Sequence, residues 1–315
     1  MHANPQRLNE VPSLRLHEAP ETGTLAPLMV RFVKLLWKAI WRAFDHDAFA
    51  IAKASAYSAI LTFFPTLLVL GSVLATGKGT EAYTREISYA LARILPAGAS
   101  TAVAYLRGTS QRSVGLLFTT SLIALWLASG AMISWMEGFR RCYELPKIWG
   151  LVKERLIAIS LVILAGIPMT FATVLIAFGS KIELTILAYL DRELGFFVLL
   201  MWMFIRWLIA ILTSVAVIAL IYHNAVPRTQ PWHSVLPGAT LATGMWFIVT
   251  MLFGWYLQNY ADYSVIYGSL GVAIALLVWM YLISLVILIG AEFNAILFPR
   301  RSLLGSELTA IGSPS

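Results

Sequence analysis

Apolar side chains fill most positions of residues 268–298. Between Gly271 and Gly290 the chain carries no charged residue and no proline. A helix needs about 20 such residues to cross the hydrocarbon core of a bilayer, whereas a helix of this length in a soluble protein keeps a polar face. The pattern therefore predicts a membrane-spanning helix.

Earlier apolar runs repeat this pattern and are separated by polar connectors. The predicted spans are residues 55–75, 114–134, 156–178, 196–222, 235–257 and 268–298. Pro65 and Pro168 lie inside the first and third spans, where the missing N–H of proline predicts a kink. The predicted fold class is all-α, a polytopic membrane protein with six transmembrane helices and amphipathic surface helices.

Residues 25–54 are predicted to form an amphipathic cytoplasmic or interfacial helix. Four basic residues recur there at spacings of three and four and so share one helical face: Arg31, Lys34, Lys38 and Arg42. A basic face favours a helix that lies on anionic lipid. Packing against another cytoplasmic element is the alternative.

The remaining segments are more polar. Residues 1–24 are expected to be a disordered cytoplasmic tail, because they hold scattered charges and no long apolar run. Residues 299–315 are expected to be a second cytoplasmic tail. Residues 76–113 predict one or two amphipathic helices along the outer surface, and residues 181–193 predict a short outer loop.

Composition and charge agree with a membrane protein. Hydrophobic residues make up 59% of the chain and charged residues only 12%, against about a quarter in soluble domains. The net charge of +7 comes from basic residues between the spans, as the positive-inside rule predicts for cytoplasmic segments. Both termini are therefore expected in the cytoplasm, and no nucleic acid is expected as a partner.

Arg206 is the first candidate functional residue, because it lies well inside the fourth span. Charged residues at membrane depth usually face a bundle interior or a wet cavity. At 1.5 Å per residue, Pro65, Trp126 and Trp279 come out at a similar depth. Arg206 is expected to bind the carbonyl freed by the proline or to stack on one of the tryptophans. A site for a substrate anion or lipid headgroup is the alternative.

A polar cluster is the second candidate site and is expected where the spans meet the cytoplasm. Its predicted members are Glu292, Asn294, Glu137, Arg140 and Tyr57. A salt-bridge network that holds helix ends together is one interpretation, and a proton- or substrate-coupled carboxylate is the other. Glycines of the fifth and sixth spans are expected to permit close helix contact or hinging: Gly238, Gly244, Gly254, Gly268, Gly271 and Gly290.

Three runs of the sequence carry a family resemblance: YSAILTFFP, WHSVLPGATLATGMWFIVTMLFGWYLQNYADYSVIYGSLG and LVWMYLISLVILIGAEFNA. Together they resemble the YihY/virulence factor BrkB family, with family-motif residues Tyr267, Gly268, Ser269, Gly271 and Gly290. The resemblance implies a six-span bacterial inner-membrane protein with both termini in the cytoplasm. It also implies a loose link to virulence and serum resistance.

Some members of that family carry a ribonuclease BN label, which the sequence does not favour. A metal-dependent nuclease needs His and Asp side chains that converge on metal ions. His46, between Asp45 and Asp47, belongs to the only dense group, and we interpret that group as a polar helix end. No metal, no cofactor and no enzymatic activity are expected.

The predicted function is transporter-like: the protein moves or guides a lipid or another amphiphilic envelope component. Membrane lipids are the expected partners, together with envelope-assembly proteins. The alternative is a non-transporting scaffold for envelope assembly. A cavity that reaches Arg206 would favour transport.

Overall fold

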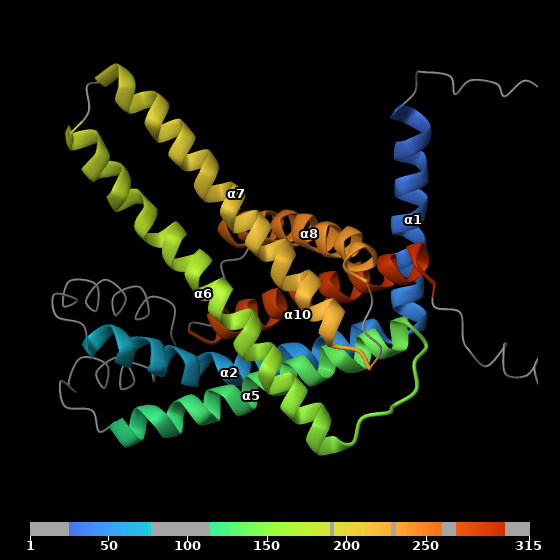
Figure 1. The fold of residues 1–315 in the computed structure, drawn as a ribbon. Coiled ribbons are helices and arrows are strands. Elements are labelled where there is room, and N and C mark those ends of the chain that lie inside the picture. Colours follow the sequence, from blue (N-terminus) through green and yellow to red (C-terminus); the bar gives the residue numbers. More distant parts are fainter. Residues whose placement is uncertain (1–24, 77–113, 190–191, 228–230, 260–268, 300–315) are drawn as a thin grey trace, which may run out of the picture.

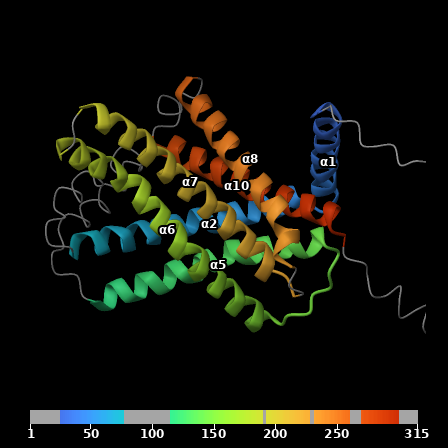
Figure 2. The same cartoon turned by 45° about the horizontal axis from the view of Figure 1, so that its top comes forward.

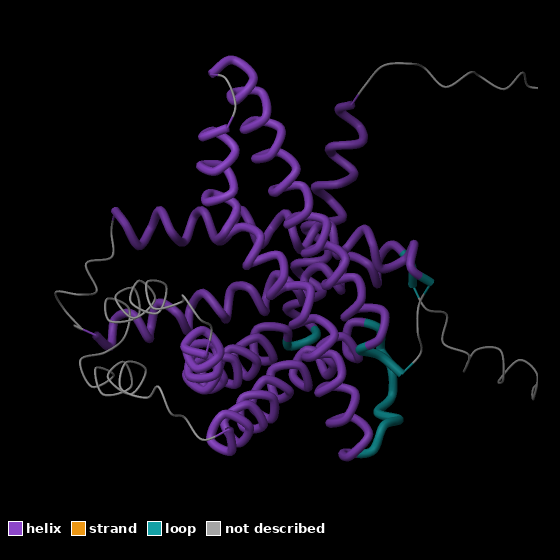
Figure 3. The backbone as a smooth tube through the Cα atoms, turned by 60° about the vertical axis from the view of Figure 1, so that its left-hand side comes forward, coloured by secondary structure: helices purple, strands orange, loops and turns teal. Residues whose placement is uncertain are grey.

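The computed structural model describes residues 25–76, 114–189, 192–227, 231–259 and 269–299. This part of the chain is helical apart from short connections (Figure 3). The helices are α1 (Leu25–Asp45), α2 (Ala48–Thr76), α5 (Val114–Cys142), α6 (Leu151–Tyr189), α7 (Arg192–Asn224), α8 (Trp232–Asn259) and α10 (Ser269–Leu297). The all-α prediction is therefore confirmed.

Each predicted span corresponds to one long helix, and we call α2, α5, α6, α7, α8 and α10 the span helices. Five of them, α5 to α8 and α10, are long and apolar enough within their described residues to cross a membrane. In α2 the described apolar part is shorter, Ala48–Phe63. Pro65 and Pro168 both lie inside continuous helices.

The span helices pack mainly as neighbouring pairs. α2 lies beside α5, α6 beside α7, and α8 beside α10, while α10 also contacts α2 and α7 also contacts α8. Figures 1 and 2 show the α6–α7 pair diverging from α2 and α5 toward the tip of the pair. α1 lies across the ends of α2 and α10 (Figures 1 and 2). We call this end of the bundle the α1 end and the opposite end the far end.

The buried core lies toward the α1 end. Its largest fully buried apolar side chains include Phe139, Tyr222, Leu288 and Val235, all in the halves of their helices nearer α1. Toward the far end, by contrast, α7 and α8 expose many large apolar side chains, such as Phe204 and Met251. In a chain with these apolar helices, such a surface suits contact with lipid.

Two boundaries differ from the sequence prediction. The chain turns at residues 46–47, so that residues 48–54 begin α2 and do not continue the amphipathic helix; Asp47 has a φ of 58° there. Within the loop predicted at 181–193, residues 181–189 belong to α6 and residues 192–193 to α7, while 190–191 lie outside the described residues. The predictions for residues 1–24, 77–113 and 300–315 also lie outside the described residues.

Candidate functional site

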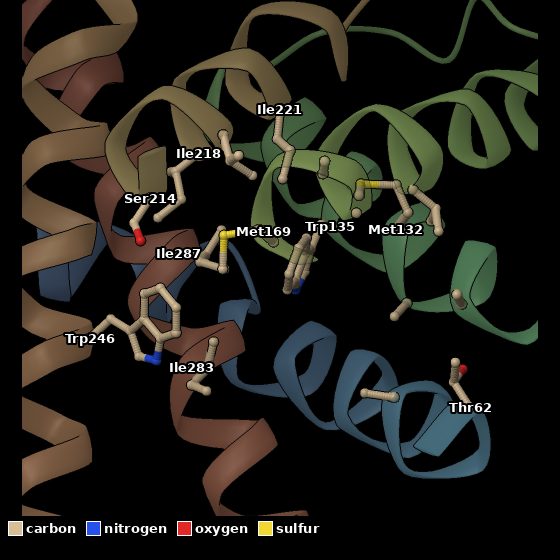
Figure 4. A pocket seen from close by; sticks show the side chains of 17 residues that line it. Thr62, Met132, Trp135, Met169, Ser214, Ile218, Ile221, Trp246, Ile283 and Ile287 are labelled. Carbon is tan, nitrogen blue, oxygen red and sulfur yellow. The ribbon is translucent and has the colours of Figure 1, made fainter. Parts of the chain in front are cut away.

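A cavity of about 380 Å³ lies between the span helices and is open to the protein surface. Every span helix contributes to its lining. In Figure 4 the side chains of Trp135, Met169 and Ile287, from α5, α6 and α10, come together in the middle of the view. We call this space the central cavity.

Small side chains on α2, α5 and α6 leave the room for the central cavity: Ala59, Ala128, Ala131, Ala165 and Gly166. A Cβ atom at Gly166 would meet nothing within 4 Å. The α6 backbone therefore borders open space at this point.

The lining of the central cavity is almost entirely apolar. Its two hydroxyl groups are turned back to their own helices, since Thr62 donates to Ser58 O at 2.8 Å and Ser214 donates to Ala210 O at 2.9 Å. No charged residue is among the described residues that line it. Such a cavity suits hydrocarbon better than ions or polar solutes.

A second cavity, of about 320 Å³, lies between α8 and α10. Thr250, Phe253, Gly254 and Trp279 are among the residues that line it. Trp279 donates from Nε1 to Thr250 Oγ1 at 3.3 Å. This contact places the predicted candidate Trp279 on an apolar groove toward the far end.

Arg206 does not line either of these cavities. It is half-buried on α7, with Nε and Nη1 shielded from the surface, and α7 packs on α6 and α8. The cation that stacks on Trp126 is Arg155, 3.9 Å from the ring centroid. The contacts of Trp126 and Trp279 thus differ from the predicted ones with Arg206, because α5 and α10 present these rings to other neighbours.

Glu292 on α10 is a fully buried carboxylate held by two residues of the α1 segment. Its Oε1 lies 2.5 Å from His46 Nδ1, and its Oε2 lies 3.4 Å from Arg42 Nε. The Glu292 side chain is 0% exposed, whereas those of Arg42 and His46 are 28% and 23% exposed. A buried charge needs such partners, so this contact fixes α1 against α10.

Asn294, two residues further along the chain, joins α10 to α8 instead. Its Oδ1 accepts from Gly238 N at 2.6 Å, and its Nδ2 donates to Val235 O at 3.0 Å. Gly238 also borders Gly290, and a Cβ on Gly290 would lie 2.7 Å from Gly238 O. Gly238 and Gly290 thus provide the close helix contact that was predicted from the glycines.

The other glycines of the two spans differ from this pair. A Cβ at Gly244 or Gly254 would meet nothing within 4 Å, so neither supports a close helix contact. Gly271 is buried near the start of α10, which begins at the motif residue Ser269. Tyr267 and Gly268 lie outside the described residues.

Asn294→Ala is expected to lower the free energy of unfolding by about 1–3 kcal/mol, because a buried donor that loses its partner carries that penalty. Unfolding by sodium dodecyl sulfate, followed by circular dichroism, measures the change. Asn259→Ala is the matched control, since Asn259 is exposed and donates to Trp255 O of its own helix. Equal stability of the two variants would contradict the bridging role of Asn294.

The predicted polar cluster is divided in the structure. Glu137 pairs with Arg140 and with Arg141, and Arg141 Nη1 reaches Asp47 Oδ2 at 2.7 Å. Tyr57 is 63% exposed and lies outside both groups. The helix-end group at residues 45–47 is also divided, because His46 contacts Glu292 while Asp47 contacts Arg141.

Arg42 and His46 are the functional candidates that sequence reasoning missed as partners of Glu292. Their spacing of four residues puts them on one face of a helix, and this signal was present in the sequence. Within the described residues, no group of three or more His, Cys, Asp or Glu side chains could hold a metal ion.

Comparison with known proteins identifies related chains. The family model described as virulence factor BrkB matches residues 39–307. The chain is 29% identical to YfkH of Bacillus subtilis (strain 168), a protein named as ribonuclease-like, over 82% of this chain and 93% of that protein. It is 28% identical to a UPF0761 membrane protein of Tolumonas auensis, over 85% of each chain. No solved structure matches.

Proposed function

We propose that this chain, which belongs to the virulence factor BrkB family of integral membrane proteins, binds the hydrocarbon part of a lipid or another amphiphilic envelope component and moves or guides it. The membrane would be the bacterial inner membrane. The chain itself would carry out no bond-breaking chemistry. Envelope-assembly proteins are the further partners that this function would require.

The central cavity is the observation that carries the proposal. Its volume of about 380 Å³ falls in the range of about 300–1,000 Å³ that is typical of ligand pockets. Its lining is apolar and comes from every span helix, so an occupant would contact both diverging helix pairs. A bilayer supplies occupants of that chemistry at high concentration.

The α1 end is proposed to face the cytoplasm. The described basic residues gather there on α1, at the end of α5 and at the start of α6, for example Lys38, Arg140 and Lys153. Only Lys181 and Arg192 are basic near the tips of α6 and α7. This distribution agrees with the positive-inside rule. It supports a cytoplasmic location for the described helix ends that precede and follow the spans.

Gly166→Phe tests the function, because it adds a bulky side chain where the backbone borders the central cavity. We expect it to slow lipid scrambling in proteoliposomes by at least about tenfold, since a misfit of one methylene in an apolar pocket already costs about 1–3 kcal/mol. Dithionite reduction of a fluorescent phospholipid measures the rate. The matched control is Gly244→Phe, because a Cβ atom at Gly244 would also meet nothing within 4 Å and Gly244 does not line the cavity.

Equal rates for the two glycine variants, at matched folded yield, would remove the central cavity from the path. Wild-type vesicles without any lipid movement would favour the scaffold alternative. Arg206→Ala in the same assay tests whether the path also passes this residue. The ribonuclease-like name of the Bacillus relative is tested by incubating the purified wild-type protein with RNA and divalent metal ions.

A further inference from the structure

α1 presents three different faces along its length. One face packs on the bundle through Ala39 and Ala43, which are fully buried, and through Leu36 and Ile40. The two other faces are exposed, and they differ in chemistry. α1 therefore offers two exposed faces to a partner, in addition to the face that packs on the bundle.

The second face is an exposed apolar row, which we call the aromatic row: Val30, Val33, Trp37, Trp41 and Phe44. Spacings of three and four residues align it along one side of the helix. Each member is more than half exposed, with Trp37 at 60% and Phe44 at 62%. The rings of Trp37, Trp41 and Phe44 follow one another in edge-on contacts, with centroids 5.9 and 6.3 Å apart.

The third face is basic and borders the aromatic row one position further along the sequence. Arg31, Lys34 and Lys38 are all exposed, and none has an ion-pair partner within the described part of the chain. Arg42 belongs to the same face but forms an ion pair with Glu292. Three exposed cations therefore accompany the aromatic row.

The direction of α1 suits a location at a membrane surface. α1 crosses the ends of α2 and α10 rather than running beside them (Figures 1 and 2). A helix across the ends of spanning helices lies along the plane of the bilayer. Trp prefers the boundary between headgroups and acyl chains, and basic side chains beside it attract anionic headgroups.

We infer that α1 docks on the bilayer leaflet at the α1 end. The aromatic row enters the boundary between headgroups and acyl chains, and Arg31, Lys34 and Lys38 gather anionic phospholipids beside it. The contacts of Arg42 and His46 with Glu292 hold the docked helix to α10. This lipid site is separate from the central cavity, and it does not depend on transport.

Nitroxide scanning of the full-length protein in nanodiscs tests the docking. Single cysteines are introduced at 33, 37 and 41 in the aromatic row and at 34 and 38 on the basic face, which we call the basic row. The native Cys142 is buried, so labelled wild type serves as the blank. We expect oxygen to relax the aromatic-row labels more than a water-soluble nickel chelate does. The basic-row labels should show the opposite order, because they lie nearer to water.

Other occupants of the aromatic row would give different results, and each would overturn the proposal. If the nickel chelate relaxed the labels of both faces more than oxygen does, α1 would lie in water. Labels in the aromatic row that are shielded from both reagents would place another part of this chain over it. Spin–spin broadening that grows with the ratio of protein to lipid would place a second copy there.

Lipid charge is tested with a bimane label on Trp41→Cys and brominated phospholipids as quenchers. Brominated phosphatidylglycerol is expected to quench several-fold more than brominated phosphatidylcholine at the same mole fraction. Arg31→Gln/Lys34→Gln/Lys38→Gln should abolish this preference and leave the depth of the label unchanged. Lys53→Gln, an exposed lysine on α2, should retain it. If both lipids quenched the label equally while Arg31, Lys34 and Lys38 are all present, the anionic site would be overturned.

Discussion

Arg42→Met is expected to lower the free energy of unfolding by up to about 3–5 kcal/mol, the penalty when a fully buried ion pair loses one partner, because Glu292 is fully buried while Arg42 is 28% exposed. The variant leaves the Glu292 carboxylate, which is 0% exposed, with His46 and the buried Cys142 thiol beside it. Methionine keeps most of the apolar contact of the arginine stem, so the change isolates the charge. A titration with sodium dodecyl sulfate, followed by circular dichroism, gives the free energy.

The reason for this large effect can be tested by removing the charge on both sides. Glu292→Gln in the Arg42→Met background should recover most of the lost stability, because the amide no longer needs a cation. Arg31→Met is the matched control, since Arg31 is exposed on the same helix, and surface changes usually stay within about 0.5 kcal/mol. Equal unfolding free energies for Arg42→Met and Arg31→Met would show that the α1 contact adds nothing to stability.

The span helices could be predicted from the sequence because a bilayer requires long apolar runs, whatever the packing around them. Their ends were harder to predict. Lys181 and Glu183 suggested a loop, yet α6 continues to Tyr189, since Lys and Glu are good helix formers outside the hydrocarbon. The turn at residues 46–47 was predicted in part, because the group around His46 was interpreted as a polar helix end and α1 does end at Asp45. The range 25–54 was still predicted as one helix, since no glycine or proline marks the turn.

The candidate sites depended on information that the sequence does not contain. Depth along a helix can be counted, but the face that a residue presents depends on the tilt and rotation of its helix. Arg206, Trp126 and Trp279 were grouped by depth alone, and the structure gives the two rings other neighbours. The central cavity was not predictable, because residues such as Ala59 and Gly166 are ordinary in apolar helices until several helices bring them together.

Glu292 shows what part of a site can be inferred from sequence. A carboxylate near the end of an apolar helix predicts a polar partner, and this expectation is met. One partner, His46, is however 246 residues away along the chain. Its choice depends on α1 crossing the end of α10, which follows from the turn at residues 46–47. Local patterns therefore predicted the need for a partner but not its identity.

Gly238→Ala is expected to lower the free energy of unfolding by about 3 kcal/mol, at the upper end of the range for overpacking. A Cβ there would overlap the carbonyl oxygen of Gly290 and lie 2.5 Å from Asn294 Cγ. A backbone atom cannot rotate away as a side chain can, so α8 and α10 would have to separate. The separation would also break the bonds of Asn294 to Gly238 N and Val235 O.

Gly244→Ala, six residues further along α8, is the matched control with the opposite expected sign. Its Cβ would meet nothing within 4 Å, and alanine in place of glycine inside a helix stabilises by about 0.5–1 kcal/mol. Melting of both variants in the same detergent, followed by size-exclusion chromatography, compares them directly. Two variants of equal stability would mean that the α8–α10 contact yields easily, in which case the two helices could slide past each other when the central cavity is occupied.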